Sequence, residues 1–288
     1  MKTSDKLLIS VGILFFIIPL MGMIIVSKVY FKTAKTQDNV TYEFFNDKSF
    51  AKPSKGRTAI PINRPFHAIH IINGNKSCME LHLNQSNDYG VKIPKGSKEE
   101  ISFKVKNNVL NIILRKGFRT PSYENRMLIT VYSPKFDALS IKNTSDFNLI
   151  ATSDSLNISL ANCKSFTVQN PNVEAHTLKS KGGLMNYKTV NTMLIKNLNV
   201  DLDNSEFSLS DQSVDNLSFK AQNNSTINLD GTNENKGKFV AGKLKIKTLG
   251  VNVIKIDNFT AKEIKADFSE ETTLEIPSSI LKLLVKSN

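Results

Sequence analysis

The possible folds of this chain are limited above all by a succession of short segments in which apolar residues stand two apart. In residues 101–105 and 110–114 every second side chain is Ile, Phe, Val or Leu, and Asn107 and Asn108 lie between the two segments. Such alternation, bounded by Asn, Gly, Ser or Pro, is typical of half-buried β-strands. Helical spacing is nearly missing after residue 65. The sequence therefore predicts an all-β domain.

Beyond Pro134 the segments become shorter and begin to resemble one another. Residues 136–141 (FDALSI) resemble 214–219 (VDNLSF), and 147–149 (FNL) resemble 227–229 (INL). The unit is roughly two short strands in twenty-odd residues, a period typical of stacked arrays. Each strand offers too few apolar side chains for a core of its own. Stacking coil on coil would join them into one interior, with parallel strands supplying the backbone hydrogen bonds.

We therefore predict a β-solenoid, similar to a right-handed β-helix, over residues 66–288. Asn, Asp and Ser at 143–145, 203–205 and 223–225 are expected at its corners, where their side chains can satisfy bent backbone. The tail 277–284 would close one end of the stack. A β-sandwich is the structural alternative, because regularly spaced short strands also favour that architecture.

The N-terminal segment 1–35 contains an uncharged apolar run. Residues 7–26 read LLISVGILFFIIPLMGMIIV, and twenty helical residues span about 30 Å, the thickness of a bilayer's hydrocarbon core. A cleavable signal peptide has a shorter apolar run and an A-x-A-like site, which residues 27–31 (SKVYF) lack. The run predicts one uncleaved transmembrane helix. Pro53 and Pro61 interrupt the following stretch, so 36–65 is expected to be a linker.

The orientation in the membrane does not follow from the flanking charges. Lys28, Lys32 and Lys35 slightly favour a cytoplasmic C-terminal side, but large domains translocate largely regardless of such charges. We expect a single-pass cell-membrane protein whose C-terminal domain lies outside the cytoplasm, on the periplasmic side.

The formal net charge of +12 could indicate an anionic partner. The lysines, however, are spread singly, often at alternate positions such as Lys243, Lys245 and Lys247. This spacing favours the solvated face of strands, with an anion-binding surface as the alternative. Nucleic acid is not expected, because aromatic residues are not interleaved with a basic patch.

Few residues are arranged for chemistry. Cys78 and Cys163 lack metal or redox spacing and are expected to be buried thiols, although an exported domain could form a disulfide. His67 and His70 should point to opposite faces of a strand, which disfavours a shared metal. Glu99-Glu100 and Glu270-Glu271 are expected to be solvated pairs. No catalytic, cofactor or metal residues are predicted. Asp201 and Asp203 could share a strand face.

Several segments together resemble a known family. They are Phe66-His67-Ala68-Ile69, Cys78-Met79-Glu80-Leu81, and residues 108–112, 127–134 and 136–141. This order resembles the GIN-domain family of auto-transporter adhesin heads, common in envelope proteins of Bacteroidetes-type bacteria. Asn143-Thr144-Ser145 stands where the family usually has a small Gly/Ser turn. The resemblance covers roughly residues 66–277, implies an exported, solenoid-like domain and carries over no catalytic residues.

The expected function is a non-catalytic, envelope-anchored structural or adhesin-like interaction module that binds a protein, a glycan or a surface polymer. The alternative is a carbohydrate-active β-helix enzyme acting on acidic glycans through Asp201 and Asp203. A sensor would need a partner, because only about six residues precede the apolar run.

Overall fold

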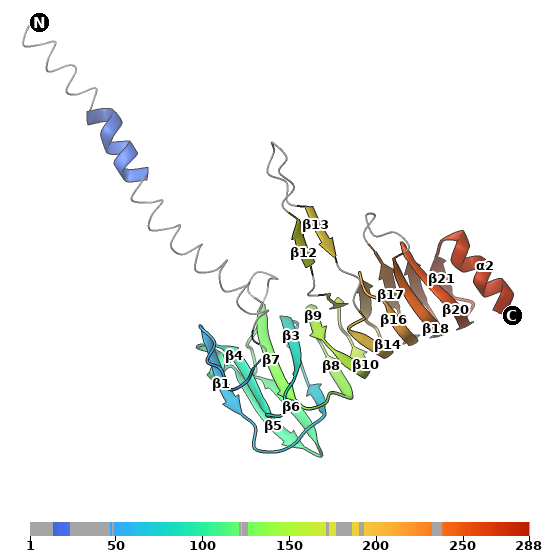
Figure 1. Cartoon of the computed structure of the whole chain (residues 1–288), viewed down its shortest axis with the longest axis horizontal. Helices are drawn as coiled ribbons and strands as arrows, with labels where there is room; N and C mark the ends of the chain where they lie inside the picture. The colour runs from blue at the N-terminus through green and yellow to red at the C-terminus, as the bar shows by residue number, and fades with distance from the viewer. Residues whose placement is uncertain are drawn as a thin grey trace, which may run out of the picture. The chain divides into compact units, whose positions relative to one another are not determined.

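The computed structural model describes residues 14–23, 47, 49–120, 122, 126–170, 173–176, 186–189, 193–231 and 238–287. The chain divides into two compact units, Met1–Lys48 and Ser49–Asn288. In the first unit residues 14–23 are helical (Figure 1). The rest of the predicted span 7–26 lies outside the described residues. No described helix combines the length and the apolar character that crossing a membrane requires.

The second unit consists almost wholly of strands, which confirms the all-β prediction. In chain order, its first elements are β1 (Arg57–Pro61), β2 (Ala68–Ile71), β3 (Cys78–Gln85), β4 (Gly90–Pro94), the short 3₁₀-helix η1 (Ser97–Glu99), β5 (Ile101–Lys106), β6 (Val109–Leu114), β7 (Met127–Ser133), β8 (Ala138–Lys142) and β9 (Asp146–Ala151). The remaining elements are β10 (Ser153–Ala161), β11 (Phe166–Val168), β12 (Val173–His176), β13 (Asn186–Thr189), β14 (Ile195–Asp203), β15 (Glu206–Ser210), β16 (Val214–Gln222), β17 (Ser225–Asp230), β18 (Phe239–Leu249), β19 (Asn252–Ile256), β20 (Phe259–Asp267), β21 (Thr272–Glu275) and α2 (Ser278–Ser287).

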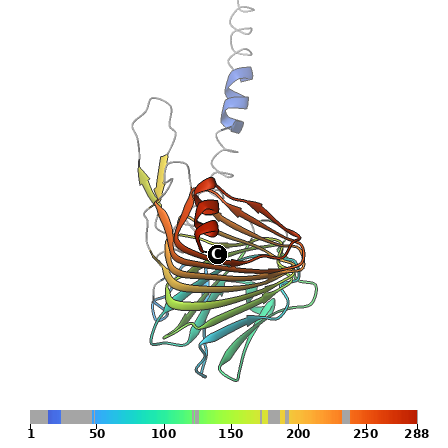
Figure 2. The ribbon, with the colours of Figure 1, turned by 90° about the vertical axis from the view of Figure 1, so that its right-hand side faces the viewer.

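The strands form two large sheets and one small one. The ten-stranded sheet has the order β1-β4-β7-β3-β9-β11-β15-β17-β19-β21, and the nine-stranded sheet the order β20-β18-β16-β14-β10-β8-β2-β6-β5. From β8 onward, successive strands fall alternately in the two large sheets, apart from the β12–β13 hairpin. Each strand pairs in parallel with the next strand of the same sheet, so that one strand from each large sheet makes up one round of the chain. Figure 2 shows these strands as nested layers.

Before β8, β2 and β3 still pair in parallel with their neighbours, but other strands depart from the predicted series of parallel coils. β1 pairs antiparallel with β4, β4 with β7, and β5 with β6. The cause at β5–β6 is local, since Asn107 and Asn108 both have positive φ, 52° and 58°, as a tight two-residue hairpin turn requires. The predicted linker 36–65 is likewise wrong over Arg57–Pro61, because β1 completes an edge of the ten-stranded sheet.

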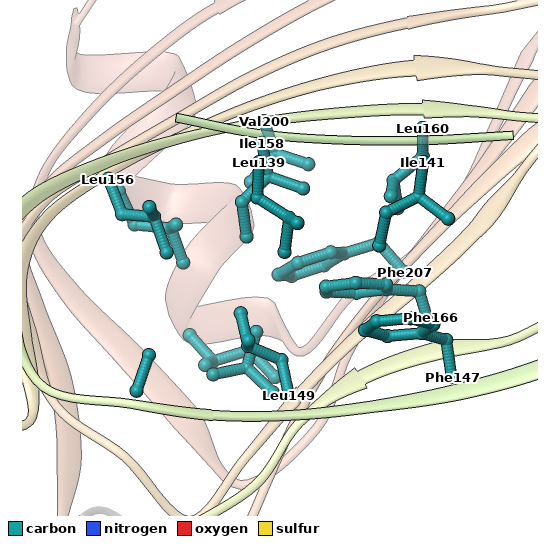
Figure 3. Packing of buried hydrophobic residues seen from close by; sticks show 14 of the residues in the cluster. Leu139, Ile141, Phe147, Leu149, Leu156, Ile158, Leu160, Phe166, Val200 and Phe207 are labelled. Carbon is teal, nitrogen blue, oxygen red and sulfur yellow. The ribbon is translucent and has the colours of Figure 1, made fainter. Parts of the chain in front are cut away.

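The interior of the second unit is a stack of apolar side chains in register. Phe147, Phe166 and Phe207 occupy matched positions of β9, β11 and β15 (Figure 3). The rings of Phe166 and Phe207 have centroids 5.7 Å apart, and Phe207 meets Phe219 of the opposite sheet edge-on at 5.3 Å. Because all four rings are buried, both sheets share one core.

Asparagines turn the chain from the nine-stranded sheet into the ten-stranded one. Asn143, Asn162, Asn204 and Asn224 each follow such a strand and have φ between 47° and 60°. Asn adopts this left-handed conformation more readily than most residues. Asn204 Nδ2 also donates to Asn162 Oδ1 at 2.8 Å. The predicted corner segments do lie at corners.

Next to these asparagines stands a buried corner column, formed by Cys163, Ser205, Ser225 and Asn252. The backbone N–H of Cys163 donates to Ser205 Oγ (3.0 Å), that of Ser205 to Ser225 Oγ (3.2 Å), and that of Ser225 to Asn252 Oδ1 (3.1 Å). The side chains of Ser205, Ser225 and Asn252 thereby each satisfy a buried backbone donor of the adjoining round.

Helix α2 begins after Pro277 and packs on β20, the edge strand of the nine-stranded sheet. Its Ile280 is only 1% exposed. The helix therefore covers the last strand of this sheet, as expected for a tail that closes one end.

Candidate functional site

An open groove crosses the outward face of the nine-stranded sheet, over the carboxyl-terminal ends of β8, β10, β14, β16 and β18. Its volume is about 490 Å³. Its lining comprises Lys142, Ser159, Leu160, Ala161, Asp201, Leu202, Asp203, Lys220, Ala221, Gln222, Lys247 and Leu249.

Strand alternation explains why charged residues line the groove. In β14, Val200 and Leu202 are buried in the core, so Asp201 and Asp203 between and beyond them face outward. Parallel pairing then repeats the arrangement from strand to strand. The prediction that Asp201 and Asp203 share a face is confirmed.

The register places opposite and like charges side by side. Asp201 is paired in register with Lys220, and Lys220 with Lys247. Neighbouring strands lie about 4.8 Å apart, so each of these side chains is within reach of the next. The first pair is favourable and the second unfavourable for the folded chain.

Two of the charges have partners of their own. Asp203 Oδ1 accepts a hydrogen bond from Asn223 Nδ2 at 2.6 Å, and Lys247 Nζ donates to Asp267 Oδ2 at 2.7 Å. Within the described part of the chain, Asp201, Lys142 and Lys220 form no hydrogen bond or ion pair through their side chains. These three charges are therefore available to a ligand.

A second hollow of about 340 Å³ continues the groove toward the first strands of the sheet. It shares Ser159 and Asp201 with the groove and reaches His70 in β2 and Val109 in β6. Together the two hollows run from β6 to β18, across six strand-to-strand steps. At about 4.8 Å a step the combined length is about 29 Å. We call this the long groove.

His70 is the histidine that lines the long groove. Burial lowers the pKa of His70, the charge of Lys142 lowers it further, and a hydrogen bond with Asn111 opposes both. His67 lies just before β2 and contacts Asp137 instead, with Nδ1 3.1 Å from Oδ2. His70 therefore adds less positive charge to the groove than an unperturbed histidine would.

Other residues singled out in the sequence lie away from the groove. Cys78 and Cys163 are buried free thiols, and burial raises the pKa of Cys78. Glu99 is exposed. Glu100 is not a freely solvated carboxylate, because its Oε2 lies 2.7 Å from Arg115 Nε.

A buried ionic cluster in the ten-stranded sheet was not among the sequence-based expectations. Glu80 Oε1 lies 2.7 Å from His82 Nε2, and Glu80 Oε2 pairs with Arg126 Nε. Burial alone would raise the pKa of Glu80, but hydrogen bonds and charge from His82 and Arg126 hold it below the usual range. The only sequence signal is that Glu80 and His82 stand two apart between the apolar residues of β3.

Lys92 is a second buried charge that the sequence does not reveal. It is 1% exposed, and its Nζ donates to Ser49 O, Lys52 O and Ser54 Oγ at 2.7–2.8 Å. The same Nζ lies 5.4 Å from the ring centroid of Tyr132. These contacts hold residues 49–54 against the ten-stranded sheet, so the role of Lys92 is structural.

Comparison with known proteins gives one family. Residues 66–279 match the family described as "Putative auto-transporter adhesin, head GIN domain". No curated protein matches the sequence.

Several solved bacterial protein structures are similar to this chain. A putative adhesin from Bacteroides fragilis is 16% identical, with 78% of this chain and 99% of that chain covered and a TM-score of 0.40. A putative lipid binding protein from Parabacteroides distasonis is 14% identical, with 77% and 94% covered and a TM-score of 0.39. A putative adhesin from the same species is 10% identical, with 76% and 96% covered and a TM-score of 0.32.

Proposed function

The chain belongs to the head GIN domain family, and from that membership we propose that it is a non-catalytic, adhesin-like binding module of the cell envelope. The observation that carries the proposal is the long groove, an open surface in which Asp201, Lys142 and Lys220 have no partner among the described residues. Charged side chains left open along a groove favour recognition of an external polymer or protein.

We infer that the strands from β8 to β21 wind as a right-handed β-solenoid. The alternation of strands between two sheets, the parallel pairing and the repeated left-handed asparagines support this, and parallel crossovers are almost always right-handed. An experimental structure in which β10, β14 and β16 were not adjacent rungs would overturn it.

We place the binding module outside the cytoplasm, held by the apolar segment 7–26. The support is the length of that segment, the helical residues 14–23 and the adhesin family. Protease added to spheroplasts expressing the full chain should digest the C-terminal domain while a cytoplasmic marker survives. A domain that resists protease until the cells are lysed would reverse this placement.

Binding itself is tested with the full chain reconstituted into lipid vesicles. Vesicles carrying the chain should retain at least one polymer from a panel of polysaccharides and surface proteins, saturably and above protein-free vesicles. If none of the panel is retained above that background, the proposed function fails.

A carbohydrate-active enzyme is the second candidate, because Asp201 and Asp203 line the same groove as Lys142 and Lys220. The bond between Asp203 and Asn223 disfavours it, since this carboxylate already has a partner. Prolonged incubation with acidic polysaccharides should leave their chain length unchanged. Cleavage that disappears in Asp201→Asn while binding persists would replace the binding proposal with the enzymatic one.

A further inference from the structure

We propose that the long groove binds a linear acidic polysaccharide, an inference that rests on the proposed binding function and names its ligand class. Three independent features of the outward face support it: an excess of lysine charge, ordered groups suited to hydroxyls, and an elongated shape.

The excess charge lies on the last three strands of the nine-stranded sheet. Exposed residues of β16, β18 and β20 include three acids, Asp215, Glu263 and Asp267. The exposed lysines of the same strands are Lys220, Lys243, Lys245, Lys247, Lys262 and Lys265. Six positive and three negative charges leave a surplus of three on and beside the groove. The groove lining itself holds three lysines, Lys142, Lys220 and Lys247, against two aspartates, Asp201 and Asp203, so both the lining and its border attract an anionic ligand.

The strand register places some of these lysines directly beside one another, so that their charges repel. Lys220 is paired in register with Lys247, and Lys245 with Lys265. Like charges directly opposite each other destabilise a sheet. Lys247 is hydrogen-bonded to Asp267 and Lys265 lies 3.7 Å from Glu263 Oε1, whereas Lys220 and Lys245 have no acidic partner among the described residues. Anionic groups bound between these lysines would relieve the repulsion. A ligand with acidic groups at regular intervals meets this requirement best.

The adjoining part of the groove offers fixed hydrogen-bonding groups. Asn199 Nδ2 donates to Asn157 Oδ1 at 2.9 Å, which orients both amides on neighbouring strands. Ser159 and Asp201 stand beside them in the shared part of the two hollows. Hydroxyl, amide and carboxylate side chains in one row suit the many hydroxyl groups of a sugar polymer.

The shape and lining disfavour other polyanions. A groove about 29 Å long and open at its side fits an extended chain rather than a compact molecule or a flat membrane surface. Its described lining contains no Phe, Tyr or Trp on which nucleic acid bases could stack. An acidic sugar chain satisfies the charge, the hydroxyl-binding groups and the length together.

The test uses the full chain in neutral-lipid vesicles, with polygalacturonate as the acidic probe and dextran as the neutral one. DNA serves as a polyanion whose charges are phosphates rather than the carboxylates of sugar acids. The variant Lys142→Gln/Lys220→Gln removes two unpartnered groove charges. Lys95→Gln/Lys98→Gln is the matched control, because both lysines are exposed and lie outside the groove lining. Equal thermal midpoints of the two variants establish that both fold.

We expect polygalacturonate to bind and dextran to bind at least about tenfold more weakly. The groove variant should lose about tenfold or more in affinity, the control variant less than about twofold, and Lys142→Arg/Lys220→Arg should restore binding. If dextran or DNA bound as tightly as polygalacturonate, the ligand class would be overturned while a binding function stayed intact. The same holds if the groove variant and the control variant bound polygalacturonate with equal affinity. Failure of every polymer and protein to bind would instead remove the proposed function itself.

Discussion

The ring of Phe166 lies almost parallel to the ring of Phe147, with centroids 5.3 Å apart and planes inclined by 7°. The two residues are paired in register in β11 and β9. Both are fully buried, so each ring fills the space that the short strands of one round leave to the next. The stack is the most direct sign that successive rounds share an interior.

Phe166→Ala should therefore destabilise the fold by about 3–5 kcal/mol, because it removes contacts on both sides of the ring and leaves a cavity. Denaturant unfolding followed by circular dichroism measures the loss. Leu281→Ala is the control, since Leu281 is 51% exposed, and it should cost under about 1 kcal/mol. A Phe166→Ala variant as stable as the parent would contradict the shared core.

The corner column predicts that removing a single hydroxyl group destabilises the folded chain. Ser205→Ala would leave the buried backbone N–H of Cys163 without its acceptor, which should destabilise the chain by about 1–3 kcal/mol. Ser155→Ala, at an exposed position, should stay within about 0.5 kcal/mol of the parent. Equal thermal midpoints for the two variants would show that the column does not contribute.

The left-handed corners predict that Gly and Ala, placed at the same corner position, differ in their effect on stability. At Asn204, where φ is 47°, both Gly and Ala lose the hydrogen bond to Asn162. Only Ala pays the steric cost of the left-handed conformation, so Asn204→Ala should be about 1–2 kcal/mol less stable than Asn204→Gly. If Ala were the more stable of the two in denaturant unfolding, the assigned corner conformation would be wrong.

The buried cluster predicts an acid-sensitive contribution to stability. His82 and Arg126 lower the pKa of Glu80 in the folded chain, so the contribution is present above the ordinary glutamate pKa of about 4.3. It is lost as the pH falls through the lower folded pKa. The thermal midpoint of Glu80→Gln should therefore fall less on acidification than that of the parent. The thermal midpoint of Glu270→Gln, an exposed control, should fall with pH as that of the parent does. Identical pH profiles for the parent, Glu80→Gln and Glu270→Gln would refute the assignment.

The sequence predicted the all-β class and the corners because both follow from local rules. Val200 and Leu202 alternate with Asp201 and Asp203, and Asn204 tolerates a left-handed turn wherever it occurs. The antiparallel pairing of β1 with β4 could not be predicted, since it depends on residues far apart in the chain. The Glu80 cluster could not be predicted for the same reason, because Arg126, which precedes β7, is 46 residues away from Glu80 in the chain. The groove depends on register, which sets Lys220 beside Asp201.

Amine footprinting can show whether the long groove is the surface on which this protein binds its ligand. The full chain is acetylated with and without saturating polygalacturonate, and the modification of each lysine is measured by mass spectrometry. Lys142, Lys220 and Lys247, which line the groove, should become protected while Lys95 and Lys98 react as before. Protection confined to lysines outside the groove, or equal reactivity everywhere despite bound polymer, would contradict it.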